Sequence, residues 1–218
     1  NFVPLHKKIN LLEGTNFLDI YLIRENEFIQ VEDSLEIENI KMNFEENSFG
    51  EKDALISLTP FSSTNIEDSY YFPGDLNGLD INGNQIYLES YGFFKIKAED
   101  SSKNKIDLVS NKTIQGSLKI EDSQKKTSPK RIGVWNFDEK LGTWKYVGES
   151  KKRCEDYCYY DFNLTKIGSY YALGNSVETT TINLDSYDYV APSSRRNSVD
   201  FAISPPPIPP KKPTIVLR

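Results

Sequence analysis

Apolar and polar residues alternate along the middle of the chain, in short runs at roughly ten-residue spacing. The run KTIQGSLKIED, at 112–122, shows this most clearly, because Ile114, Leu118 and Ile120 share one side with Gly116 while polar side chains occupy the other. A period of two predicts a β-strand with one buried face. Many such strands with turn residues between them predict an all-β fold, an antiparallel β-sandwich of the Ig-like or carboxypeptidase-regulatory-like kind.

Further strands are predicted on the same grounds at 16–26, 28–33, 54–61, 84–100, 131–137, 142–149, 159–165 and 168–174. Pro60 is expected to end its strand, and Gly92 is expected to mark a bulge. In 34–44 the period of two breaks, so a helix remains an alternative there. No long amphipathic helix competes with the strands elsewhere.

The segment RIGVWNFDEKLGTWKYVGES, at 131–150, predicts a hairpin with a tryptophan on each strand. Asp138 can hold the turn through its side chain, and Gly142 can supply a positive φ. Trp135 and Trp144 are expected to pack into the core, as large aromatic residues usually do. The alternative is that Trp135, Trp144 and Tyr146 are exposed and bind a ligand, stacking on sugar rings. A propeller would need further copies of this hairpin, and the sequence has none.

Composition shifts divide the chain into three predicted parts. Residues 1–54 are an N-terminal strand segment that is part of the sandwich or a layer beside it, and residues 55–190 are the β-sandwich domain. Residues 191–218 are a Pro-rich linker or tail, whose PPPIPPKKP run favours polyproline II. This run is interpreted as a stiff spacer, with binding by an SH3-like or WW-like module as the alternative.

Charge and hydropathy exclude two classes of partner. The 218 residues carry a formal net charge of −6, whereas nucleic-acid binding needs a basic surface. The same charge gives no attraction to anionic membranes. No apolar stretch approaches the 18 residues of a membrane span, so membrane insertion of this segment is not expected.

The sequence contains few candidate catalytic residues. His6 is the only histidine, and it lies near an end of the chain, so a Ser-His-Asp or Cys-His enzyme is not expected. Nothing singles out a pair among the 32 acidic residues for glycoside hydrolysis, which leaves a hydrolase as a distant alternative. The protein is therefore expected not to be an enzyme.

The run GDLNGLDINGN, at 74–84, resembles a calcium loop. An EF-hand fails here, because Gln85 and Tyr91 stand where glycine and glutamate are required. A looser calcium site using Asp75, Asn77 and Asp80 is the one metal site considered, and no other cofactor is expected. The competing interpretation is a hairpin turn with Asn-Gly at its tip.

Cys154 and Cys158 are separated by three residues. Along one extended strand they would be too far apart to bond, but in a loop or turn they could close a small disulfide ring. Two free thiols are the alternative. A zinc site would need more ligands than the chain provides nearby.

Several of these motifs together resemble a group of β-sandwich domains. They are the Pro73-Gly74-Asp75 turn, the hairpin from Asp80 to Gly83, the strand through Gly92, and the hairpin from Trp135 to Trp144. The group is found in bacterial cell-envelope proteins, often beside carboxypeptidase-regulatory-like repeats, and in the ectodomains of cartilage intermediate layer proteins. The resemblance covers about residues 55 to 175 and implies a structural or adhesive surface protein without catalytic residues.

The sequence thus predicts a non-catalytic structural or adhesive module of a larger cell-surface or secreted protein, located outside the cell or in the cell envelope. Its expected partners are other domains or subunits of a surface assembly. A carbohydrate-binding module, with a glycan as partner, is the first alternative. A cytosolic scaffold engaged through PPPIPPKKP is the second, and free cysteines would favour it.

Overall fold

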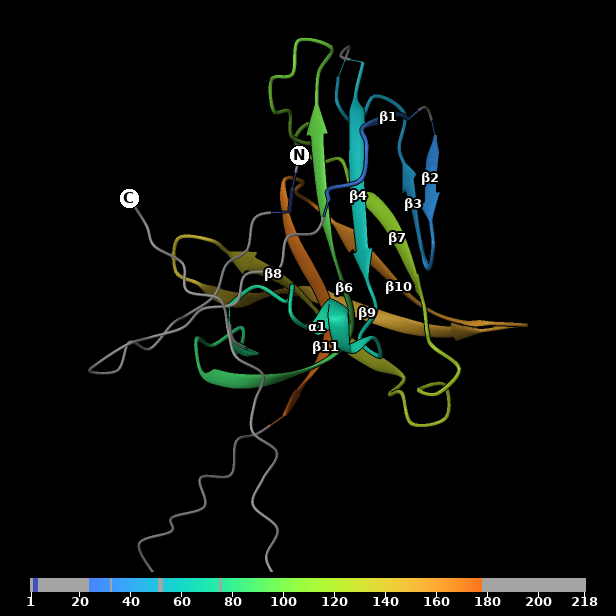
Figure 1. Cartoon of the computed structure of the whole chain (residues 1–218), viewed down its shortest axis with the longest axis vertical. Helices are drawn as coiled ribbons and strands as arrows, with labels where there is room; N and C mark the ends of the chain where they lie inside the picture. The colour runs from blue at the N-terminus through green and yellow to red at the C-terminus, as the bar shows by residue number, and fades with distance from the viewer. Residues whose placement is uncertain (1, 4–23, 32, 51–52, 75, 178–218) are drawn as a thin grey trace, which may run out of the picture. The chain divides into compact units, whose positions relative to one another are not determined.

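The described residues form strands with a single short helix, α1 (Ile66–Ser69) (Figure 1). The computed structural model describes residues 2–3, 24–31, 33–50, 53–74 and 76–177. The strands are β1 (Ile29–Gln30), β2 (Ser34–Ile37), β3 (Ile40–Phe44), β4 (Leu55–Phe61), β5 (Asn77–Leu79), β6 (Gln85–Glu99), β7 (Ile114–Lys119), β8 (Arg131–Asp138), β9 (Thr143–Cys154), β10 (Cys158–Leu164) and β11 (Ser169–Val177). The predicted all-β, sandwich-like fold is confirmed.

Ten of these strands pair in the order β1-β4-β6-β11-β8-β9-β10-β7-β3-β2, and every pairing along this path is antiparallel. The sheet folds back on itself, because Cα atoms of β2, at one end, come within 8 Å of Cα atoms of β4, near the other. The inward side chains of both halves form the main core. Fully buried members are Ile40, Leu58, Phe94, Leu118 and Leu173.

The strand β5 closes a second circuit of strands. It pairs antiparallel with β6 and parallel with β9, while β6 pairs with β11, β11 with β8, and β8 with β9. A second core, rich in aromatic side chains, is built on these strands. It contains Phe93, Phe137, Trp144 and Tyr170, joined by Phe72 from the segment after α1. Strands such as β6 and β11 therefore bury both faces.

A bulge in β6 lets one strand serve both cores. Ser90 pairs with Gly174 and Gly92 pairs with Leu173, so Tyr91 is an extra residue. Because one extra residue reverses the alternation of side chains, Leu88 faces the second core while the even-numbered residues after the bulge face the main core. Gly92 has a φ of 152°, and a Cβ there would lie 2.9 Å from a methyl carbon of Leu118, so the position favours glycine.

The segment 34–44 is a hairpin, and the helical alternative is wrong. Ile37 pairs with Ile40, and Glu38, with a φ of 52°, lies in the tight turn between β2 and β3. The turn explains the break in the period of two, since Leu35 and Ile40 face the core on separate strands. The expectation that Pro60 ends its strand is also wrong by one residue. Pro60 pairs with Phe94 inside β4, but the carbonyl of Leu58, two residues earlier, points to the other edge, where it accepts from Asn26. The nitrogen of Pro60 therefore faces that edge too, and β1 pairs there only at Leu55 and Ile56, so no ladder bond is lost.

All described residues belong to one compact unit, comprising 1–10 and 21–178, and the strands β1 to β3 are part of its sheet. The second unit, 11–20 and 179–218, lies outside the described residues. The Pro-rich segment 191–218 and most of the strand predicted at 16–26 therefore fall outside them as well. The predicted boundaries at 54 and 190 stay predictions.

Candidate functional site

The tryptophan hairpin adopts the predicted turn. Asp138 accepts hydrogen bonds from the backbone N–H groups of Lys140 and Leu141 through its carboxylate, and Gly142 has a φ of 65°. Lys145 reaches the same carboxylate at 2.7 Å. These bonds, that of Lys145 foremost, lower the pKa of Asp138.

Both tryptophans lie in the second core, as the packing interpretation expects. Trp135 is 2% exposed and Trp144 has no exposed area. They do not stack on one another: Trp144 packs against Phe137, at 5.2 Å between ring centroids, and Trp135 packs edge-on against the half-buried Tyr146, at 5.4 Å. The carbohydrate alternative needs an exposed indole face, and neither indole offers one.

The indole N–H groups bond to backbone carbonyls. Trp135 donates to Gly174 at 3.0 Å, and Trp144 donates to Pro73 at 3.2 Å. The Trp135 ring lies directly over Gly133, where a Cβ would come within 2.5 Å of the indole nitrogen. Each tryptophan thus ties its strand to a distant segment, which is a structural task.

The predicted calcium site of Asp75, Asn77 and Asp80 lies only partly within the described residues and stays a prediction. Asp75 lies outside them, and Asn77 begins β5. The carboxylate of Asp80 accepts bonds from the backbone N–H groups of Asn82 and Asn84 and from the Asn84 side chain. These bonds, the side-chain bond of Asn84 first, lower the pKa of Asp80 and hold the β5–β6 turn. Among the described residues, no three His, Cys, Asp or Glu side chains gather as a metal site.

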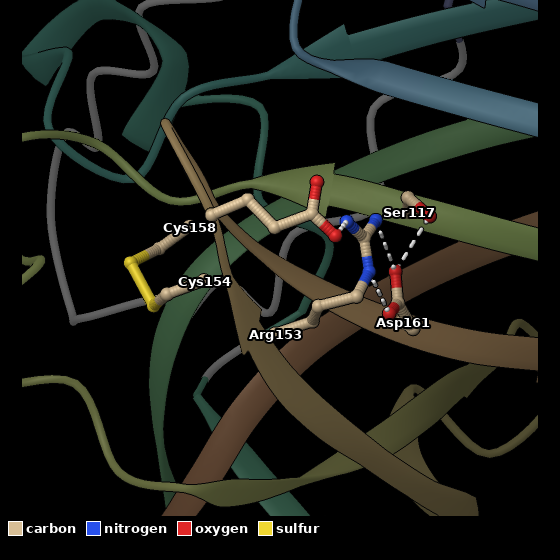
Figure 2. Close-up of polar contacts among 6 residues, drawn as sticks. Ser117, Arg153, Cys154, Cys158 and Asp161 are labelled. Atoms are coloured by element: carbon tan, nitrogen blue, oxygen red, sulfur yellow. Dashed lines mark hydrogen bonds and ion pairs between the residues drawn. A yellow bond between two sulfur atoms is a disulfide. The ribbon is translucent and has the colours of Figure 1, made fainter.

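Cys154 and Cys158 are joined by a disulfide at the tip of the β9–β10 hairpin (Figure 2). They are directly opposite one another in the strand register, with Cα atoms 4.1 Å apart. A hairpin brings the two Cβ atoms together, which a single strand could not do. The disulfide therefore closes the ends of two adjacent strands.

A charged network lies beside the disulfide (Figure 2). Arg153 holds Asp161 through two hydrogen bonds, Nε to Oδ2 at 2.8 Å and Nη2 to Oδ1 at 3.3 Å. Ser117 donates to the same carboxylate at 2.7 Å, and Glu155 contacts the other side of the guanidinium. The bond to Asp161 is the main reason that the pKa of Arg153 is raised. Sequence patterns do not indicate this network, because its members come from three strands and the β9–β10 turn.

The network borders a hollow with a volume of about 590 Å³. This volume lies within the range of roughly 300–1,000 Å³ that is typical of small-ligand pockets. The hollow lies on the outer face of the sheet, where β3, β7, β10 and β9 run side by side. Its polar lining includes Asn43, Gln115, Ser117, Lys151, Asp161 and Asn163. These side chains point away from the main core, because the residues between them are the buried ones.

A larger hollow of about 1050 Å³ lies over the second core, with Phe72, Leu88 and Phe93 in its lining. Its serine hydroxyls are already engaged within the chain. Ser69 donates to the Ile66 carbonyl at 2.6 Å, and Ser90 donates to the Gly92 carbonyl at 3.2 Å. These hydroxyls stabilise local turns, so the larger hollow offers fewer free polar groups than its volume suggests.

A buried ion cluster joins the segment 24–28 to β6. Glu25 pairs with Lys97 and lies 3.9 Å from the ammonium of Lys95, and both Glu25 and Lys95 are buried. Lys95 also lies over the ring of Tyr170, at 4.6 Å. Burial, aided by the positive charge of Lys97, lowers the pKa of Lys95 to about 8 although Glu25 opposes the shift.

No helix among the described residues is long and apolar enough to span a membrane. In comparisons with known proteins, no family model, no curated protein and no solved structure matches this chain.

Proposed function

We propose that the chain is a non-catalytic structural or adhesive module of a larger cell-surface or secreted protein. The observation that carries the proposal is the disulfide between Cys154 and Cys158. Disulfides form and persist in oxidising compartments and are rare in the cytosol. A disulfide at a hairpin tip therefore favours an extracellular or cell-envelope location over the cytosolic scaffold.

The packing of the aromatic side chains supports a structural role. Trp135 and Trp144 are buried, and their N–H groups are used to tie segments of the chain together. The same residues carry the resemblance to β-sandwich domains of surface proteins, a family of structural and adhesive modules. Aromatic residues that could have formed a binding platform instead stabilise the body of the protein.

The arrangement of carboxylates on the hollow supports a role without catalysis. Asp161 is held by Arg153, and Glu149 is held by Arg131 at 2.8 Å. Glycoside hydrolysis needs one carboxyl group that donates a proton, whereas arginine partners favour carboxylates. These two acidic residues are thus better suited to structure or binding than to acid catalysis.

The proposal is tested by thiol trapping and surface accessibility in the cells that make the protein. Native protein is alkylated without reduction and analysed by mass spectrometry, with the Cys154→Ser/Cys158→Ser double variant as the control. We expect no alkylation at either cysteine, and we expect protease added outside intact cells to degrade the domain. Alkylated cysteines together with protection from the protease would overturn the proposal and favour the cytosolic scaffold bound through PPPIPPKKP.

A further inference from the structure

Three amide side chains form a row across adjacent strands of the outer face. Asn43 of β3 is opposite Gln115 of β7, and Gln115 is opposite Asn163 of β10. All three are exposed. Within the described part of the chain their side-chain amides make no hydrogen bond, although the backbone around them is fully paired in the sheet. Each amide therefore keeps a free acceptor oxygen and a free NH₂ donor.

The row lies in the hollow of about 590 Å³, so the amides line a recess. Ser117 and Asp161 form the neighbouring row, directly opposite one another on β7 and β10. Arg153 fixes the Asp161 carboxylate from the β9 side (Figure 2). A fixed polar row beside a row of free amides presents donors and acceptors in a defined pattern.

We propose that this face, which we call the amide face (Asn43, Gln115, Ser117, Asp161 and Asn163), binds a neutral oligosaccharide. An amide can donate and accept at once, which matches the hydroxyl groups of a sugar. Neighbouring strands lie about 4.8 Å apart, a spacing comparable to the length of one sugar ring. An oligosaccharide that lies across β3, β7 and β10 would thus have one amide side chain beside each successive sugar ring.

The charge of the face favours an uncharged ligand. Basic and acidic side chains on this face are nearly balanced. The strands contribute Lys41, Lys119, Arg131, Lys151 and Arg153 together with Glu36, Glu149 and Asp161, and the β9–β10 turn adds Glu155. Both Arg153 and Arg131 are in ion pairs, and Lys119 lies over the ring of Tyr157, at 3.9 Å. An acidic polysaccharide or a nucleic acid would need unpaired basic groups in excess.

This inference rests on the proposed function, since it names the ligand class through which a surface module would adhere. It moves the carbohydrate alternative from the buried Trp135 and Trp144 to a different face of the sheet. Its test uses purified protein and does not depend on where the protein is located. A failure here would leave the thiol and protease results untouched, so the two proposals can fail separately.

The test measures binding of the full chain to fluorescently labelled hexasaccharides. The panel holds β-1,4-glucose, α-1,4-glucose, β-1,4-mannose, β-1,4-xylose and β-1,4-N-acetylglucosamine chains, with a hyaluronan hexasaccharide as the acidic comparison. We expect wild-type protein to bind at least one neutral chain. Gln115→Ala and Asn163→Ala should each weaken that binding about tenfold, as expected for the loss of a hydrogen-bonding group.

Gln85→Ala is the matched control, because Gln85 is an exposed amide at the start of β6, away from the amide face. Gln115→Glu and Asn163→Asp keep the side-chain size while removing the NH₂ donors. A loss of binding in these variants can therefore be assigned to the changed side-chain groups and not to misfolding. Absence of binding to every neutral chain would overturn the inference. So would binding of the hyaluronan chain alone, or binding that the variants of the amide face reduce no more than Gln85→Ala.

Discussion

Trp144 donates its indole N–H to the carbonyl oxygen of Pro73, which lies 71 positions earlier in the chain. The bond joins the tryptophan hairpin to the Pro73-Gly74 turn, and Gly74 lies so close to Phe137 that a Cβ there would come within 2.9 Å of its ring. Phe72, one residue before the turn, also packs on Trp144, at 4.7 Å between ring centroids. The turn and the hairpin, which the sequence presents as separate motifs, are one packed unit.

Truncation of Trp144 should therefore be strongly destabilising. Trp144→Ala is expected to lower the free energy of unfolding by about 3–5 kcal/mol, because it leaves a cavity in the second core. Leu141→Ala is the control, since Leu141 is 64% exposed in the turn of the same hairpin, and its effect should stay within about 0.5 kcal/mol. Denaturant unfolding followed by tryptophan fluorescence and circular dichroism measures both. Equal stability of the two variants would contradict the buried position of Trp144.

Substitution by alanine should change the stability of the protein in opposite directions at Gly116 and at Gly148. A Cβ at Gly116 would come within 2.3 Å of the Phe162 ring on the paired strand, whereas a Cβ at Gly148 would meet nothing within 4 Å. Gly116→Ala is expected to cost about 1–3 kcal/mol through overpacking. Gly148→Ala is expected to be neutral or to add about 0.4–1 kcal/mol, because it reduces the entropy of the unfolded chain.

A rescue experiment tests the cause. Adding Phe162→Leu to Gly116→Ala should recover part of the lost stability, since the smaller side chain leaves room for the new methyl group. Thermal and denaturant unfolding of the single and double variants give the coupling. Strict additivity of the two changes would show that the Phe162 ring is not the source of the cost.

Local sequence patterns predicted the strands and turns, because these features depend on residues that are close together in the sequence. The period of two in 112–122 and the turn chemistry of Asp138 and Gly142 identified β7 and the β8–β9 hairpin, because alternation and turn preference act over a few residues. The break in alternation at Gly92 pointed to a bulge. Its consequence is that the even-numbered residues of β6 face the second core before the bulge and the main core after it, and this could not be predicted before both cores were known.

Non-local register could not be predicted in the same way. The parallel pairing of Gly78 with Trp144 closes the second circuit of strands, and nothing near either residue in sequence specifies it. The amide face has the same origin, since Asn43, Gln115 and Asn163 meet only because β3, β7 and β10 are neighbours. The sequence also left two interpretations of Trp135 and Trp144 open, as core residues or as exposed ligand-binding residues. Only their burial in the structure distinguishes the two.

The disulfide should contribute modestly to stability. It closes a ring with a sequence separation of only four residues, and a loop of that length corresponds to roughly 2 kcal/mol in the chain-entropy model. Addition of a phosphine reductant should lower the free energy of unfolding by about that amount. The Cys154→Ser/Cys158→Ser variant should show the lower stability already and should not respond to the reductant. A wild-type protein that is equally stable in both conditions would contradict the expectation.

Lys95 should make the protein more stable as the pH rises from 8 toward 10. Burial lowers its folded-state pKa to about 8, from 10.5 for an unperturbed lysine, so between these values the unfolded chain binds more protons than the folded protein. Stability then increases with pH, because the folded protein no longer holds a buried charge at Lys95. Above pH 10 the trend should reverse. Burial raises the pKa of Tyr160 to about 12 and also raises that of Tyr170, so the unfolded chain loses its tyrosine protons first.

Denaturant unfolding at pH 7, 8, 9 and 10 measures how the free energy of unfolding of the wild-type protein changes with pH. Lys95→Met, which cannot titrate, should abolish the rise. A rise of the same size in Lys95→Met would assign it to other groups, and stability that falls between pH 8 and 10 in the wild-type protein would contradict the buried position of the Lys95 ammonium.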